Sequence, residues 1–308
     1  DKSRYGGSLL TSEVTIGNQS GKDWAEQIIS ELKSMPNVIV KNRSQVFGYY
    51  DHNMLVMTER VSDHLPKTDK YTPKQRLWYI RAKEVVISSG SIERPLVFGN
   101  NDTPGVMLSS AAKEYLKVYG VLVGKKPIIF TNNDSGYETA IEFKKNAVDP
   151  IVLDTRKDTN SEIVKEAKEL NIHIKFSHVV VAAKGYKKVN SADIAKISDD
   201  KKVISNIENV KCDCICVSGF WTPTIHLASQ SGNKTKFSEE IDAFVPSHSK
   251  QHEVTLGAAN GVFTLEETLK TSFKKGNELS KQITNNENKV SIPTVIEKKS
   301  SKHDKFWC

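Results

Sequence analysis

Apolar and polar positions alternate along this chain in short blocks, and these blocks predict a mixed α/β protein. Trp24, Ile28 and Leu32 recur near helical spacing, which predicts an amphipathic helix over residues 23–35. Short apolar runs separated by turn residues then predict a β-meander. Its expected strands are residues 38–40, 45–50 and 55–59, with a turn at 51–53, followed by one bent strand or a strand pair at 77–81 and 83–88.

The middle of the chain alternates predicted strands with predicted helices. In order, we expect a helix at 109–119, a strand at 127–131, a helix at 137–146, a strand at 150–153, a helix at 159–170 and a strand at 172–176. Short antiparallel strands at 178–183, 186–190 and 192–197 follow, then a strand at 210–217, and a last strand at 256–259 before a helix at 261–270. Such alternation predicts a parallel sheet with right-handed crossovers.

Small residues stand where several of these segments end or begin. They are Gly6-Gly7, Ser88-Ser89-Gly90, Ser218-Gly219 and Gly257-Ala258-Ala259. Small residues at strand ends let the backbone approach a ligand closely, as dinucleotide sites require, although an ordinary strand-to-loop junction explains any one of them alone. Four in order around an embedded βαβ unit are typical of the two-dinucleotide-binding flavoprotein fold.

The expected fold class is therefore α/β, with two nested Rossmann-like domains of the FAD/NAD(P)-binding, pyridine nucleotide-disulfide reductase-like kind and a β-meander insertion. Residues 1–120 and 211–282 would form the outer, FAD-like domain, without its first βαβ unit. Residues 121–210 would form the embedded, NAD(P)-like domain. Residues 283–308 are rich in Lys, Asn and Ser near their start and are expected to be a linker or tail.

The embedded βαβ unit lacks most of the expected nucleotide fingerprint. Where Gly-x-Gly-x-x-Gly would stand, the chain has Thr131-Asn132-Asn133-Asp134-Ser135-Gly136. Side chains in place of the first two glycines should crowd a bound pyrophosphate, and the Asp134 carboxylate should repel it. We predict that this half keeps the fold but has lost its nucleotide. Asp154, at a strand end, would otherwise be a natural ligand of the ribose 2′-hydroxyl.

Composition narrows the range of partners. Only seven of the 44 basic residues are Arg, and the net charge of +7 is spread along the chain, so we expect no nucleic-acid partner. No apolar run reaches the roughly 18 residues of a membrane helix, and no secretory signal opens the chain, so we expect no membrane partner. The chain begins at Asp1 with mid-domain character, which predicts a fragment.

The cysteines predict neither a metal site nor a redox pair. Cys212, Cys214 and Cys216 alternate in one expected strand, so all three should share a face as buried reduced thiols, which implies a reducing compartment. One-residue spacing suits zinc poorly, and Cys308 is uninformative. A free-standing pyridine nucleotide-disulfide reductase would need a Cys-x-x-Cys or equivalent, which Cys212-Asp213-Cys214 is not.

Several short sequence segments resemble those of one known protein family. They are residues 46–53 (VFGYYDHN), 59–65 (ERVSDHL), 92–101 (IERPLVFGNN), 102–107 (DTPGVM), 130–134 (FTNND) and 217–232 (VSGFWTPTIHLASQSG). The chain resembles the α subunit of heterotetrameric sarcosine oxidase nearly from end to end. That resemblance implies a cytoplasmic enzyme with β, γ and δ subunits that demethylates sarcosine oxidatively to glycine. The enzyme passes one-carbon units to tetrahydrofolate and forms hydrogen peroxide.

The resemblance also implies a division of cofactors. NAD would lie in this two-dinucleotide-binding portion, FAD on the β subunit, FMN between α and β, and tetrahydrofolate in a C-terminal region. The chain starts after the family's glycine-rich fingerprint and ends before the folate region. We therefore expect that this polypeptide alone neither oxidises sarcosine nor binds folate, and we assign it no catalytic residue and no metal.

We expect NAD in the outer half. The residues expected to contact the cofactor are Gly6, Gly7, Ser89, Gly90, Ser91, Glu93, Gly219, Trp221, Gly257 and Ala258, with Asp154 as the contact if the embedded half holds it instead. Glu93 and Arg94, next to Pro95, could instead shape their loop. Two alternatives stay open. One is a cofactor-free structural or interface module of such a complex; the other is a subunit of a related FAD/NAD-dependent amine dehydrogenase.

Overall fold

The computed structural model describes residues 3–284 and 291–306, and it divides the chain into two units. Unit 1 comprises Asp1–Ile92 and Thr222–Glu297, and unit 2 comprises Glu93–Trp221 and Lys298–Cys308. The chain therefore crosses between the units three times. The short strands at the first two crossings, β7 (Ser91–Glu93) and β16 (Trp221–Pro223), pair with each other.

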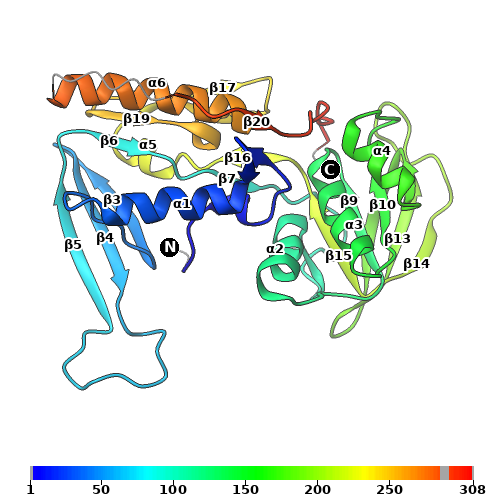
Figure 1. The fold of residues 1–308 in the computed structure, drawn as a ribbon. Coiled ribbons are helices and arrows are strands. Elements are labelled where there is room, and N and C mark those ends of the chain that lie inside the picture. The colour runs from blue at the N-terminus through cyan, green and yellow to red at the C-terminus, as the bar shows by residue number, and fades with distance from the viewer. Residues whose placement is uncertain (1–2, 285–290, 307–308) are drawn as a thin grey trace. The chain divides into compact units, whose positions relative to one another are not determined.

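Unit 2 is built on a five-stranded parallel sheet in the order β11-β10-β9-β15-β8. Figure 1 labels its strands β9, β10 and β15. The strands are β8 (Val106–Leu108), β9 (Pro127–Thr131), β10 (Ile151–Asp154), β11 (His173–Phe176) and β15 (Cys214–Ser218). Because β8 joins this sheet, unit 2 begins at Glu93, ahead of the expected start of the embedded domain at residue 121. The expected alternation of strands and helices is present.

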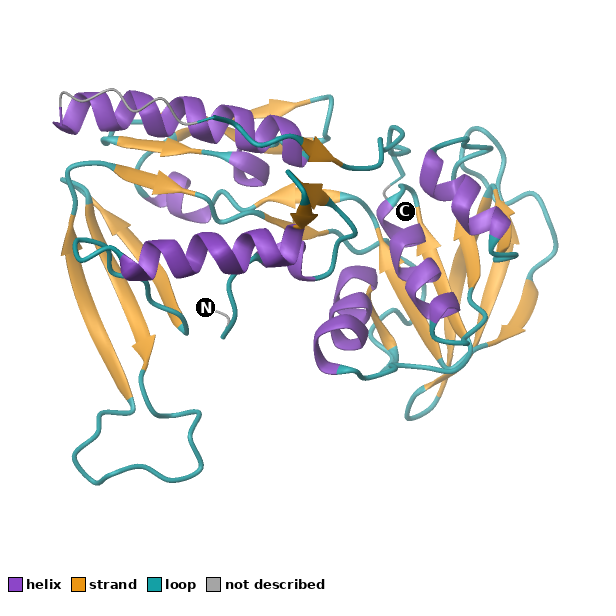
Figure 2. Ribbon diagram, viewed as in Figure 1, coloured by secondary structure: helices purple, strands orange, loops and turns teal. Residues whose placement is uncertain are grey.

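Opposite faces of this sheet carry two separate clusters of apolar side chains. Ile129 of β9 and Val152 of β10 pack with the helices α2 (Ser109–Tyr119), α3 (Ser135–Lys145) and α4 (Glu162–Glu169). Ile128 and Phe130 of β9 point to the other cluster, because successive side chains on a strand alternate between faces. There they pack against the antiparallel sheet of β12 (His178–Gly185), β13 (Val189–Lys196) and β14 (Glu208–Lys211) (Figure 2).

Unit 1 combines the β-meander with a short parallel strand pair. The meander is β3 (Ser44–Tyr50), β4 (Met54–Arg60) and β5 (Gln75–Arg81), and β6 (Val85–Ile87) runs parallel to β19 (Glu253–Thr255). Tyr49 and Leu55 pack with Val85 and Ile87 in the core of this unit. The remaining elements are η1 (Gly7–Leu10), β1 (Thr15–Ile16), β2 (Gln19–Ser20), α1 (Gly21–Ser34), α5 (His226–Gln230), β17 (Lys234–Ser238), β18 (Ala243–His248), η2 (Gly257–Asn260), α6 (Leu265–Thr284) and β20 (Val295–Ile296).

Several expected elements are confirmed, and the turn at residues 51–53 is explained by its backbone. The helix at 109–119 and the strand at 127–131 have the expected bounds. His52 and Asn53 both have left-handed φ angles, of 60° and 51°, as a tight hairpin turn requires. Asn53 also donates to the carbonyls of Lys83 and His252, which ties the turn to unit 1. The interpretation of Asp51-His52 as turn material holds.

Other expected strands are wrong. Residues 38–40 form no strand, since the Val38 amide bonds back to the Met35 carbonyl. Residues 186–188 form a turn rather than part of a separate strand, and residues 189–196 are one strand. The last strand lies at 253–255, not at 256–259, where the backbone instead forms η2. The segment expected to be a linker or tail continues α6 to Thr284 and contributes β20, which pairs with β1.

The expected strand at 210–217 is broken at Cys212 and Asp213. The Asp213 carboxylate accepts the backbone amides of Lys125 and Lys126, at 2.8 Å each, and this turn separates β14 from β15. Consequently the three thiols do not share a face. Cys214 and Cys216 pack toward the helices, and Cys212 packs on the opposite side. All three are buried and free, and burial raises the pKa of Cys212 to about 12. Cys308 lies outside the described residues.

Within residues 3–284 and 291–306, no helix has both the length and the apolar content needed to cross a membrane. In the same part of the chain, no group of three or more His, Cys, Asp or Glu side chains is arranged to hold a metal ion.

Candidate functional site

The carboxyl ends of β6 and β19 bring together two of the small-residue segments expected at a nucleotide. The strands run parallel, with Ile87 opposite Thr255, so both lead to the same edge. Ser89 and Gly90 follow β6, and Gly257 and Ala258 follow β19. In α/β sheets, ligands bind outside the carboxyl ends of parallel strands. We call this place in unit 1 the outer edge.

The outer edge leaves polar atoms and space of the kind that a ligand could use. Gly90 has φ 75°, and a Cβ added there would meet no atom within 4 Å. The Gly90 carbonyl accepts the Thr224 amide, at 2.9 Å, while the Thr224 hydroxyl is buried without a partner. The Thr255 hydroxyl, at the end of β19, is also buried and unpartnered. Two orphaned hydroxyls beside an open glycine fit the close approach of a polar ligand.

Other expected contact residues of unit 1 lie in short, tightly turned segments. Gly6 precedes η1 with φ 117°, and Gly7 begins it with φ 53°. A Cβ on Gly6 would meet the end of the Leu10 side chain at 3.0 Å, and the positive φ of Gly6 disfavours any other residue. Gly257 has φ 63° and begins η2, and Ser91 begins β7. The positive φ angles of Gly6, Gly7 and Gly257 account for these three glycines without a ligand.

Glu93, Gly219 and Trp221 belong to unit 2, and each has a partner within the protein. One Glu93 oxygen accepts the Ser110 amide at 2.7 Å, at the start of α2; the other is buried without a hydrogen bond. A Cβ on Gly219 would come within 2.8 Å of the Arg94 carbonyl, so only glycine fits there. The Trp221 indole donates to the Ser135 hydroxyl at 2.9 Å. These contacts shape the loops where unit 2 begins and ends.

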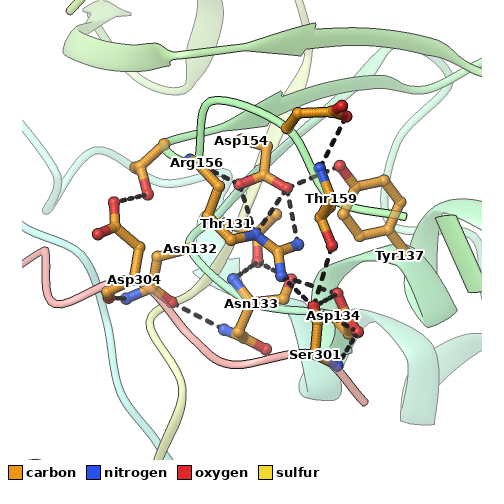
Figure 3. A network of polar contacts seen from close by, with 12 residues as sticks. Thr131, Asn132, Asn133, Asp134, Tyr137, Asp154, Arg156, Thr159, Ser301 and Asp304 are labelled. Carbon is orange, nitrogen blue, oxygen red and sulfur yellow. Dashed lines mark hydrogen bonds and ion pairs between the residues drawn. The ribbon is translucent and has the colours of Figure 1, made fainter. Parts of the chain in front are cut away.

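Asp154 is completely buried, and its oxygens are occupied by protein donors. Tyr137 donates its hydroxyl to Asp154 at 2.7 Å, and the Arg156 guanidinium donates to both oxygens, at 2.8–3.1 Å (Figure 3). Burial and the Asp154 charge raise the pKa of Tyr137, which keeps the phenol protonated as a donor. With 0 % of Asp154 exposed, its carboxylate is committed to the interior of unit 2.

Arg156 also neutralises Asp134, the residue that replaces part of the nucleotide fingerprint. One terminal nitrogen of Arg156 lies 2.8 Å from Asp134 and the other lies 2.8 Å from Asp154, so the guanidinium bridges two buried carboxylates. Burial alone would lower the pKa of Arg156, but the hydrogen bonds and charges of Asp154 and Asp134 outweigh it and raise that pKa. The expectation that Asp134 acts as a free repelling charge is therefore modified: its charge is paired within the protein.

Side chains fill the place where fingerprint glycines would leave room. Asn133 is buried and donates to the Ser218 carbonyl at 3.0 Å and to the Asn132 side chain at 2.9 Å. Gly136 alone keeps its expected part, since an added Cβ would lie 2.7 Å from the Thr131 Cβ. In the fingerprint, the third glycine serves helix–strand packing, and that is the role retained here.

At the carboxyl ends of β9 and β10 in unit 2, the sequence analysis missed three residues, namely Arg156, Ser301 and Asp304. Ser301 and Asp304 bind the loop between β9 and α3, although they lie about 170 positions further along the chain. No pattern in the sequence predicts that contact. Arg156 carried a weak signal, because it stands two positions after the strand-end acid Asp154.

No family model matches this chain. Sarcosine oxidase subunit alpha of Rhizobium meliloti (strain 1021) is 37% identical over 256 residues, covering 82% of this chain and 25% of that protein. The subunit of the same name from Corynebacterium sp. (strain P-1) is 30% identical, covering 90% of this chain and 29% of that protein.

This chain is a relative of sarcosine oxidase subunit alpha. The resemblance drawn from the sequence motifs is thereby confirmed. The chain spans about a quarter of the length of these curated relatives.

Solved structures confirm the fold. L-proline dehydrogenase from P. horikoshii matches with a TM-score of 0.63 at 18% identity, covering 93% of this chain and 50% of that one. T. acidophilum thioredoxin reductase matches with a TM-score of 0.60 at 14% identity, covering 84% and 81%. The expected FAD/NAD(P)-binding, disulfide reductase-like α/β fold is therefore present.

Proposed function

We propose that this chain is the nucleotide-binding part of the α subunit of a heterotetrameric sarcosine oxidase. Its role would be to bind NAD at the outer edge and to support assembly with a flavin-bearing β subunit. The complex would demethylate sarcosine oxidatively to glycine, transfer the one-carbon unit to tetrahydrofolate and form hydrogen peroxide. The isolated chain would not catalyse this reaction.

The observation that carries this proposal is the extent of the match to sarcosine oxidase α subunits. Identity of 29–37% extends over 82–90% of the chain, so the likeness includes both units and not one motif. The shared fold with dehydrogenases and reductases supports a role in oxidoreduction. Since the chain covers 25–29% of those relatives, the catalytic steps and the folate chemistry belong to the proposal for the whole complex.

The outer edge supports NAD in unit 1. Gly90 leaves open space, and Thr224 and Thr255 offer unpartnered hydroxyls, whereas Asp154 of unit 2 is saturated by Arg156 and Tyr137. A dinucleotide bound there would take hydrogen bonds from these hydroxyls and lie against backbone at Ser89 and Gly90. NAD would supply a hydride acceptor, and this chain's residues would bind and orient it. FAD, FMN and tetrahydrofolate would lie elsewhere in the complex.

A matched pair of glycine variants tests this assignment in the full subunit purified with its partners. Gly90→Asn fills the open space at the outer edge, while Gly120→Asn places the same side chain after α2, at a glycine with a similar φ of 66° and equal space. Asn tolerates left-handed backbone in both places. We expect isothermal titration calorimetry to show at least about tenfold weaker NAD binding for Gly90→Asn, as lost ligand contacts of about 1.4 kcal/mol require, and unchanged binding for Gly120→Asn.

Two results would contradict the assignment. Tight NAD binding that survives Gly90→Asn but is abolished by Asp154→Asn would place the nucleotide in unit 2. No NAD binding by the intact complex would instead favour the cofactor-free interface module.

A further inference from the structure

The carboxyl edge of the unit 2 sheet is covered by a segment of this same chain. Residues 301–306, here called the docking segment, lie across the ends of β9 and β10, where a Rossmann fold would hold a dinucleotide (Figure 3). The contacts of this segment come from backbone, charged side chains and aromatic rings.

Ser301 binds the fingerprint loop through its backbone and its side chain together. Its amide donates to Asp134 at 2.7 Å, and its hydroxyl donates to both oxygens of the same carboxylate at 2.9 Å. Arg156 in turn donates to the Ser301 hydroxyl at 2.7 Å. Asp134 and Arg156 are 4 % and 8 % exposed, so Ser301 binds charged groups that are buried in unit 2. The loop therefore offers an acceptor for N–H and O–H groups, the opposite of what a phosphate needs.

Asp304 binds the other side of the loop. Its amide donates to the Asn132 carbonyl and its carbonyl accepts from the Asn132 side chain, both at 2.8 Å. The Asp304 carboxylate accepts the Thr155 hydroxyl at 2.9 Å and pairs with Lys201. Thr155 follows Asp154 directly at the end of β10. This carboxylate thus lies beside the position where a nucleotide ribose would meet the strand-end acid.

Two rings anchor the docking segment. Phe306 is 6 % exposed and belongs to the apolar cluster between the parallel sheet and the sheet of β12, β13 and β14. Its ring centroid lies 6.4 Å from that of Phe130. The His303 ring stacks on Phe220, with centroids 4.0 Å apart and planes within 10°. Phe220 holds a left-handed φ of 76°, which is strained for an aromatic residue. The segment is therefore held by burial as well as by hydrogen bonds.

We propose that this edge of unit 2 is a docking site for the chain's own residues 301–306, which occupy it to the exclusion of a nucleotide. Its recognition chemistry is that of a peptide. The Asn132 carbonyl and side-chain amide bind the backbone of Asp304, Asp134 accepts N–H and O–H groups, and an apolar socket takes Phe306. A hollow of about 530 Å³ remains beside the segment. Of the lysines that line it, Lys157, Lys201 and Lys302, the first two form ion pairs with Asp199 and Asp304.

Hydrogen exchange of the full chain tests the proposal with adjacent serines as a matched pair. Ser301 is bound, whereas Ser300 is exposed. The amides of Ser301 and Asp304 are expected to exchange at least about tenfold more slowly than in an unstructured peptide, because both donate to protein acceptors. The double variant Ser301→Ala with Asp304→Ala should raise their exchange about tenfold or more, and Ser300→Ala should leave it unchanged. Protection within α3 serves as the internal check that unit 2 stays folded.

The same measurement is repeated with millimolar NAD⁺ or NADP⁺. Unchanged protection of the docking segment is expected with either nucleotide. Acceleration by a nucleotide would overturn the proposal, because it would show that nucleotide and segment compete for this edge. Unprotected amides at Ser301 and Asp304 in the unmodified chain would overturn it as well. Neither outcome depends on NAD binding in unit 1, which the calorimetric titration measures separately.

Discussion

Arg156 is a charged residue that lies in the interior of unit 2, with 8 % of it exposed. Its guanidinium lies between Asp154 and Asp134, with one terminal nitrogen 2.8 Å from each. Two buried carboxylates with no cation between them would repel each other in a poorly polarisable interior. The sequence marked Asp154 as a possible ribose ligand and Asp134 as a repelling charge, yet both are structural members of one ion-paired network. A single Arg thus changes the meaning of both acids.

Replacing Arg156 by Met should destabilise unit 2 strongly. The change keeps the length of the side chain but leaves Asp154 and Asp134 unpaired, and breaking a buried pair in this way costs about 3 kcal/mol or more. Urea unfolding followed by circular dichroism measures the loss. Arg60→Met is the control, because Arg60 pairs with Asp63 from a half-exposed position. It should cost no more than about 1 kcal/mol. Equal losses for the two variants would contradict the buried-network account.

At the scale of elements, a helix or strand was predicted correctly where local sequence decides its bounds, and wrongly where contacts with distant residues decide them. The helix at 109–119 was predicted correctly because its apolar spacing and the stop at Gly120 are local. The strand at 210–217 was predicted as one piece because its apolar alternation continues without interruption. Asp213 breaks it only because Lys125 and Lys126 present their amides from 87 or more positions earlier. Pairing of that kind leaves no trace in local periodicity.

Glu93 caps helix α2 from a buried position, and this makes the stability of that helix depend on pH. Burial raises the pKa of Glu93 above its ordinary value of 4.5, although bonds from Ser218 and Ser110 partly oppose this. The folded chain therefore holds this proton more tightly than the unfolded chain. Its contribution to stability is present below pH 4.5 and is lost as the pH rises through the raised value.

Glu93→Gln should remove that dependence. The amide oxygen can still accept the Ser110 N–H, but it never ionises, so the variant should gain stability relative to the unmodified chain as the pH rises from 5 to 8. Urea midpoints measured across this range provide the test. Glu169→Gln, at an exposed position near the end of α4, should run parallel to the unmodified protein. A Glu93→Gln curve parallel to it too would show that Glu93 titrates normally.

At the scale of the whole chain, each unit has apolar clusters of its own. Those of unit 2 lie on the two faces of its parallel sheet, and that of unit 1 lies between the β-meander and β6. Both units are assembled from segments distant in sequence, because the chain crosses between them three times. The crossings at 92/93 and 221/222 lie at β7 and β16.

A matched pair of leucines tests whether the two cores open separately. Leu55→Ala in unit 1 and Leu153→Ala in unit 2 each remove three side-chain carbons from a buried site, and each should cost about 2–5 kcal/mol. Hydrogen exchange read by mass spectrometry should show faster exchange only in peptides of the altered unit. Loss of protection throughout the chain with either variant would show that the two units unfold as one.

The sequence by itself determined the fold class and the kinship with sarcosine oxidase α subunits. These depend on periodicity, on small residues at strand ends and on strings such as residues 92–101, all of which are local. Only the tertiary structure showed that Arg156 joins Asp154 to Asp134 and that Ser301 and Asp304 cover the loop between β9 and α3. Contacts between residues far apart in sequence depend on how β9, β10 and the docking segment meet in space. Local spacing carries no information about that meeting.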